Sequence, residues 1–142
     1  MTDERSTGAK SRKGINVVLW VVQVLLALEF LLAGGIKLAM PIAAMAKQAG
    51  MPGPFLRFIG VMELLGAIGL ILPGILRIRT ILTPLAAAGL VVIMIGATVI
   101  MFRMNGGVQA LTPAVVGVLA AFVAYGRWRL APLRDSSQAS QL

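Results

Sequence analysis

Residues 58–73 read FIGVMELLGAIGLILP, an apolar segment that contains a single charged residue, Glu63. Together with the apolar residues before it, this segment is long enough to cross the ~30 Å hydrocarbon core of a bilayer as a helix. A carboxylate at the centre of such a helix costs at least about 2.5–3.5 kcal/mol, so it usually faces a partner, a cavity or a ligand. Glu29 interrupts another apolar run in the same way. Glu29 and Glu63 are therefore the first candidates for a functional site.

Four apolar runs, each about 20 residues long or a little longer, organise the chain. The predicted membrane spans are 15–40, 55–72, 81–102 and 108–125. Because the connectors between them are short, consecutive spans should run antiparallel, as in an up-down-up-down four-helix bundle. We predict an all-α integral membrane protein with one four-span domain at 15–127. A basic, disordered tail is predicted at 1–14 and a second tail at 128–142.

The composition is typical of a membrane protein. Hydrophobic residues make up 58% of the 142 residues, charged residues make up 13%, and the mean hydropathy is +0.92. A typical soluble domain is about a quarter charged. The net charge of +8 would suggest a nucleic-acid partner in a soluble protein, but here the positive-inside rule explains it. The chain has no Cys and no His, which excludes disulfide exchange, thiolate catalysis, His-ligated haem and nearly all zinc and copper sites.

The distribution of Lys and Arg predicts the orientation of the protein. Basic residues are concentrated in the segments 1–14, 73–79 and 127–134, which share one side of the membrane if there are four spans. The other side carries fewer of them. Because cytoplasmic segments carry the excess of Lys and Arg, we expect both termini to be cytoplasmic.

The two carboxylates are predicted at a similar depth. At 1.5 Å per residue, Glu29 lies about 21 Å from the cytoplasmic boundary and Glu63 about 12 Å below the outer one, so both fall in the outer half of the bilayer. Other polar residues expected in the same half are Lys37, Arg57, Thr98 and Arg103. We interpret this group as a ligand-binding or proton-responsive pocket open to the outer face. In the alternative, a structural network pairs Glu29 with Lys37 and bonds Glu63 to Ser, Thr or backbone groups.

Small residues should supply the surfaces on which the helices pack. Gly60, Glu63 and Ala67 have helical spacing, which places Glu63 on an inward-facing seam of small residues. The glycines predicted at helix contacts are Gly34, Gly60, Gly66, Gly69 and Gly96. Such motifs also occur at homodimer interfaces, so a homo-oligomer is an alternative. The methionines, Met94 and Met101 among them, suit either an adaptable apolar pocket or plain core filling.

The segment 58–73 resembles the second-span signature of the DoxX-like family of small four-span bacterial membrane proteins, through Gly60, Glu63, Gly66 and Pro73. The segment 30–38, FLLAGGIKL, is similar to the F-x-x-x-G-x-x-K-L stretch of that family's first span. Segment 82–97 is similar to its third span, and 124–127, AYGR, fits its closing residues. The resemblance covers about residues 15–127.

This resemblance implies a multi-pass protein of the bacterial inner (plasma) membrane. Names within the family point to quinone-linked oxidation of sulfur compounds and to membrane oxidoreductase complexes. The polar residues that match family motifs are Lys37 and Glu63, whereas Glu29 belongs to none of them. Many members carry a His in the third span, but the corresponding stretch here, 98–103, has none. This difference argues against a redox or metal role for the chain.

Three functions stay open as hypotheses. The first is a non-catalytic accessory subunit or a small lipid- or quinone-binding module, in which Glu63 and Lys37 hold a polar head group. The second is a subunit of a quinone-linked membrane oxidoreductase. Because the chain has no Cys, His or flavin motif, a partner subunit would then carry the redox centre. The third is a small proton-coupled transporter that uses Glu29, as small multidrug exporters use a Glu in their first span. Expected partners are membrane lipids and a redox subunit, and quinone is the cofactor considered.

Overall fold

The computed structural model describes residues 2–131, and within that range it contains helices and turns but no strand. The helices are α1 (Thr2–Ala39), α2 (Ile42–Ala49), α3 (Gly53–Leu76), α4 (Leu82–Asn105), α5 (Gly107–Tyr125) and the short π-helix η1 (Gly126–Leu130). Four of them, α1, α3, α4 and α5, are long and apolar enough to cross a membrane. The predicted all-α, four-span architecture is confirmed.

The helix boundaries depart from the predicted spans mainly outside the apolar runs. α1 begins at Thr2, so residues 2–14, which we predicted as a disordered tail, continue the helix of the first span. This segment contains no proline, and a helix that has already formed extends far more easily than a new one starts. The connector at 41–54 contains α2, which ends at Gly50 in the left-handed conformation (φ 64°). Residues 132–142 of the second predicted tail lie outside the described residues.

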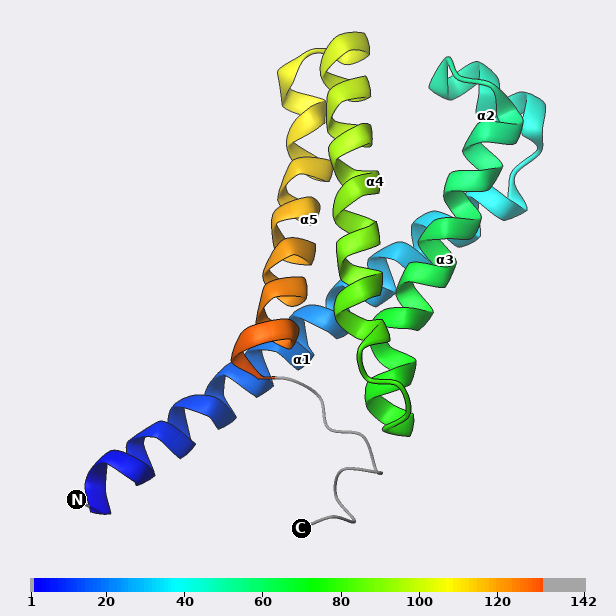
Figure 1. Ribbon diagram of the computed structural model, residues 1–142. Helices are drawn as coiled ribbons and strands as arrows, with labels where there is room; N and C mark the ends of the chain where they lie inside the picture. Colours follow the sequence, from blue (N-terminus) through cyan, green and yellow to red (C-terminus); the bar gives the residue numbers. More distant parts are fainter. Residues whose placement is uncertain (1, 132–142) are drawn as a thin grey trace.

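The four long helices form two hairpins. α1 packs along α3, α4 packs along α5, and α3 also contacts α4. Figure 1 shows that the hairpins meet at the level of η1 and separate toward the end that carries α2 and the α4–α5 turn. We call the end with η1 and the α3–α4 turn the proximal end, and the end with α2 the distal end. The backbones of the two hairpins are therefore close together at the proximal end and farther apart at the distal end.

Large apolar side chains cover the outside of the bundle. Val92, Val118 and Leu32 are 70%, 69% and 67% exposed. In the apolar windows of the four spans, no more than a third of the residues are buried within the chain. In water, exposed apolar surface costs about 25 cal/mol for each Å², whereas lipid tails are as apolar as the side chains that they touch. The chain is therefore a multi-pass membrane protein.

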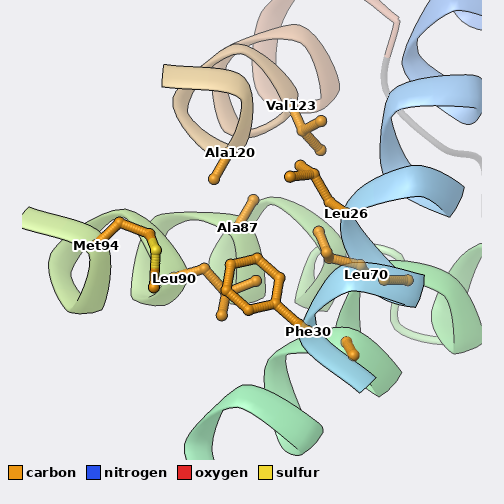
Figure 2. Close-up of a cluster of buried hydrophobic side chains, with 10 residues drawn as sticks. Leu26, Phe30, Leu70, Ala87, Leu90, Met94, Ala120 and Val123 are labelled. Carbon is orange, nitrogen blue, oxygen red and sulfur yellow. The ribbon is translucent and has the colours of Figure 1, made fainter. Parts of the chain in front are cut away.

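A cluster of buried apolar side chains joins the two hairpins at mid-height. Side chains from all four long helices converge there (Figure 2), and the labelled ones are Leu26, Phe30, Leu70, Ala87, Leu90, Met94, Ala120 and Val123. The small Ala87 and Ala120 leave room on α4 and α5 for the larger side chains of α1. Because packed atoms gain dispersion energy only at contact distance, this cluster holds the hairpins together where they cross.

Arg127 ties the helices together at the proximal end. This η1 residue is 2% exposed; its Nε donates to Gln23 Oε1, and its Nη1 donates to Asn16 Oδ1 at 2.6 Å. The Gln23 amide in turn donates to the backbone oxygen of Leu70 at 2.7 Å. The guanidinium also lies 5.4 Å from the centroid of the Trp20 ring, within cation–π range. The network therefore links η1, α1 and α3.

Two facing glycines bring α1 and α3 close together in the distal half. A Cβ added to Gly34 would lie 2.8 Å from the backbone oxygen of Gly60. A Cβ added to Gly60 would lie 2.9 Å from the Cβ of Lys37. Only hydrogen fits at these two positions, so the two backbones approach as the small-residue pattern of membrane helices allows.

The other predicted packing glycines differ from one another. A Cβ on Gly66 would lie 2.6 Å from a side-chain carbon of α4, and a Cβ on Gly69 would lie 2.7 Å from another. At Gly96, by contrast, nothing lies within 4 Å of the Cβ position, and the residue is exposed. Within residues 2–131 the prediction of a packing role for Gly96 is wrong, because α4 turns that side of the helix away from its neighbours.

Replacing Gly34 with Ala should destabilise the protein, because the new methyl group would press against the backbone of α3. Overpacking of this kind costs about 1–3 kcal/mol in the free energy of unfolding. Gly35→Ala is the matched control, since nothing lies within 4 Å of its added Cβ and Ala is the better helix former. Thermal unfolding in detergent micelles measures both variants, and equal stability would contradict the close contact at Gly34.

Candidate functional site

A buried ion pair joins α1 to α3 in the distal half of the bundle. Lys37 Nζ donates to both carboxylate oxygens of Glu63, at 2.6 Å and 2.7 Å. The side chain of Glu63 is 4% exposed and that of Lys37 is 28% exposed. The Lys37 stem passes over Gly60, where a side chain would collide with it. Because a buried charge is tolerated only when it is paired and hydrogen-bonded, each residue depends on the other.

This pairing overturns the contacts that the structural alternative predicted for these side chains. The alternative in which Glu29 pairs with Lys37 is wrong, because the Lys37 ammonium binds both oxygens of Glu63. Glu63 also differs from that alternative, since its partner is a charged side chain and not a hydroxyl or backbone group. The two carboxylates therefore have different surroundings, although both belong to the same half of the bundle.

Glu29 lies on α1 and is exposed to the space between the hairpins. It forms no hydrogen bond or ion pair with any residue that the structure describes. It is near enough to Glu63 and Lys37 for the three charges to interact. A carboxylate inside a membrane span is costly unless something compensates it. Within residues 2–131, Glu29 therefore has no hydrogen-bond or ion-pair partner that compensates this cost.

A cavity of about 400 Å³ lies between the hairpins, within the range of about 300–1,000 Å³ that is usual for small-molecule sites. The wall formed by α1 and α3 carries the charged residues, which are Glu29, Lys37 and Glu63. The opposite wall, from α4 and α5, carries neutral groups, which are Met94, Ala97, Met101, Gln109, Thr112, Pro113 and Val116. One wall is therefore polar and charged, and the other is mainly apolar.

The core cluster forms the floor of this cavity. Phe30 and Met94 belong both to the cluster and to the cavity lining, and they are 1% and 7% exposed. These two side chains therefore close the cavity on the side of the core cluster. Figure 1 shows that the backbones of the two hairpins diverge toward the distal end. Met94 and Met101, two methionines that we considered for an adaptable pocket, line its α4 wall, where unbranched thioether side chains can adjust to the shape of a ligand.

Arg57, a predicted site residue, does not line the cavity. Its guanidinium caps α1 instead: Nη1 donates to the backbone oxygen of Leu38, and Nη2 donates to that of Met40 at 3.2 Å. The last carbonyl groups of a helix have no partner within the helix. Arg57 satisfies one of them, at Leu38, and also bonds to the carbonyl group of Met40 just after α1, which fixes the start of α3 against that end.

Thr98 and Arg103 also lie outside the cavity lining. The Thr98 hydroxyl donates to the backbone oxygen of Met94 at 2.7 Å, a bond one turn back along its own helix. Its neighbour Ala97 faces the cavity in its place. Arg103 is exposed in the last turn of α4. The depth predicted for these residues did not constrain the direction in which each side chain points.

Gln109 and Thr112 line the cavity from α5, and the sequence analysis did not include them. They are three residues apart, so they lie on one face of the helix. Both stand at the beginning of an otherwise apolar span. Polar residues in membrane spans usually face the interior of the protein. Two of them at helical spacing could therefore have predicted this part of the cavity lining from the sequence.

A family model described as the DoxX-like family matches residues 21–123. The match covers most of the chain, from the first span into the fourth. The chain therefore belongs to the DoxX-like family, as the motifs of its first and second spans indicated. The comparison with curated proteins found no match, and neither did the comparison with solved structures.

Lys37→Met should destabilise the protein more than Glu63→Gln does. The first variant leaves a 4%-exposed carboxylate without a partner, whereas the second leaves an ammonium that is 28% exposed. Removing one member of a buried pair typically costs about 3–5 kcal/mol. The double variant should recover part of the loss, because it leaves neither charge unpaired. Thermal unfolding of all three variants in one detergent tests this, and strictly additive losses would show that the two residues do not interact.

Proposed function

We propose that this DoxX-like protein binds a small amphipathic molecule, a lipid or a quinone, in the cavity between its two hairpins. The observation that supports the proposal is the cavity of about 400 Å³ with a charged wall on α1 and α3 and a methionine-containing wall on α4 and α5. Ligand sites typically combine an apolar lining with a few polar groups that orient the ligand. A molecule with a polar head and an apolar tail matches this division.

In this proposal, different residues of the cavity contact different parts of the ligand. Glu29, together with Gln109 and Thr112, supplies hydrogen-bonding groups for the head of the ligand. The Lys37–Glu63 pair holds its wall in place and contributes to the field around the head. Met94 and Met101 pack against the apolar part, and the floor at Phe30 limits how deeply the ligand enters.

The protein acts in this proposal as a binding module or accessory subunit and catalyses no reaction by itself. If the ligand is a quinone, electrons must come from a redox centre on another subunit, because the chain itself has no Cys and no His. The second hypothesis, a subunit of a quinone-linked oxidoreductase, then uses the same cavity and adds a partner subunit that carries the redox centre.

The proposed location is the bacterial inner membrane, with both termini in the cytoplasm. Basic residues of the proximal end, among them Arg77, Arg79 and Arg129, support this orientation through the positive-inside rule. The distal end, where the hairpins diverge, would then face outward. A ligand would enter the cavity from the outer leaflet or from the outer aqueous side.

Filling the cavity should remove the ligand. Ala97→Phe places a large side chain in the lining, so a molecule bound to the wild-type protein should be lost from this variant. Ala88→Phe is the matched control, because Ala88 is an exposed residue of α4 that does not line the cavity. Native mass spectrometry, with the ejected molecules identified, measures bound ligand in all three proteins. If none of them carries more than bulk lipid, the binding proposal is contradicted and a transporter becomes the better hypothesis.

The orientation can be tested with single cysteines, since the natural chain has none. Val108→Cys places a thiol near the distal turn at an 81%-exposed position, and Ile78→Cys places one in the proximal turn at a 58%-exposed position. A membrane-impermeant maleimide added to intact spheroplasts should label the first variant and not the second. Permeabilised membranes, in which both should react, are the control. The reverse pattern would show that the termini face outward.

A further inference from the structure

We infer that the cavity prefers ligands with one positive charge, such as a protonated amine or a quaternary ammonium group on an apolar tail. The inference rests on the proposed function, because it specifies the ligand of the same cavity. The preference follows from the charged side chains of the lining and from the ion pair that two of them form.

The α1–α3 wall contains two carboxylates and one ammonium group, from Glu29, Glu63 and Lys37. Lys37 donates to both oxygens of Glu63 at 2.6 Å and 2.7 Å, so these two charges neutralise each other at contact distance. Glu29 forms no hydrogen bond or ion pair within residues 2–131. The lining therefore has one uncompensated negative charge.

Among the described residues, Lys37 is the only basic side chain of the lining, and the two arginines predicted for the site do not join it. Arg57 is bonded to the carbonyl oxygens at the end of α1, and Arg103 is exposed outside the lining. The α4–α5 wall contributes no charged residue to the lining. Its Gln109 and Thr112 each offer an oxygen that can accept a hydrogen bond. A cationic head group would thus find one anion and additional acceptors.

The low dielectric constant around the cavity strengthens the effect of the Glu29 charge on the choice between cationic, neutral and anionic ligands. Electrostatic interactions are several-fold stronger near or inside protein and lipid than in bulk water. A cation bound beside Glu29 gives a neutral site, whereas an anion would add a second uncompensated charge of the same sign. The Phe30 ring at the floor and the thioethers of Met94 and Met101 provide further contacts that suit a cation or its apolar tail.

The test compares three eight-carbon probes that differ only in the head group: octylamine, octanol and octanoate. Isothermal titration in neutral maltoside micelles at pH 7, with protein-free micelles subtracted, gives each dissociation constant. We expect octylamine to bind at least about tenfold more tightly than octanol, and octanoate to bind least. Glu29→Gln should lower the affinity for octylamine to that for octanol. Arg103→Gln, which changes a charge outside the lining, should leave the preference unchanged.

A second measurement on the wild-type protein does not depend on how the Glu29 variant folds. Octyltrimethylammonium, a cation with no nucleophilic amine, should slow the labelling of Glu29 by a hydrophobic carbodiimide, located by peptide mass spectrometry, and octanol should not. Competition by a short-chain phosphatidylethanolamine, whose ammonium is accompanied by a phosphate, distinguishes a zwitterionic lipid head group from a free amine as the natural source of the cation. Equal affinity for amine and alcohol, or a preference for octanoate, overturns the charge selectivity and leaves the binding site standing. Absence of saturable binding by all three probes overturns both proposals.

Discussion

The ion pair between Lys37 and Glu63 is the interaction on which the distal half of the protein depends. Two charges at this depth are tolerated because each is the partner of the other, with the ammonium bound to both carboxylate oxygens. That geometry requires α1 and α3 to lie very close together. Gly34 and Gly60 make the approach possible, because neither position has room for a Cβ. The pair and the glycine contact therefore support one another.

The Lys37–Glu63 pair joins α1 to α3, which belong to the same hairpin. Other contacts must therefore hold the two hairpins to each other. The Arg127 network closes the proximal end, and the apolar cluster around Phe30 joins the helices at mid-height (Figure 2). Beyond that level the hairpins diverge (Figure 1), and residues of both hairpins line the cavity. The position of the cavity thus follows from the positions of the Arg127 network and the apolar cluster, and not from any one residue of the lining.

The two carboxylates in membrane spans, Glu29 and Glu63, have different roles because their surroundings differ. Glu63 is paired, nearly inaccessible and part of the contact that holds α1 to α3. Glu29 is exposed to the cavity and unpaired within the described part of the chain. The motif resemblance included Lys37 and Glu63 and left Glu29 out, which agrees with a structural role for the pair. A ligand-selecting role fits Glu29 better than Glu63, contrary to the emphasis that the motif suggested.

The sequence by itself determined the membrane class, the number of spans and the family, and it singled out Glu29 and Glu63. These properties depend on the composition of continuous segments, and a bilayer requires about 20 apolar residues for each crossing. Only the tertiary structure decided which side chains meet. Lys37 reaches Glu63, Thr98 bonds to its own helix, and Gly96 faces outward. The rotation of each helix about its axis makes these choices, and packing between segments far apart in the chain fixes that rotation.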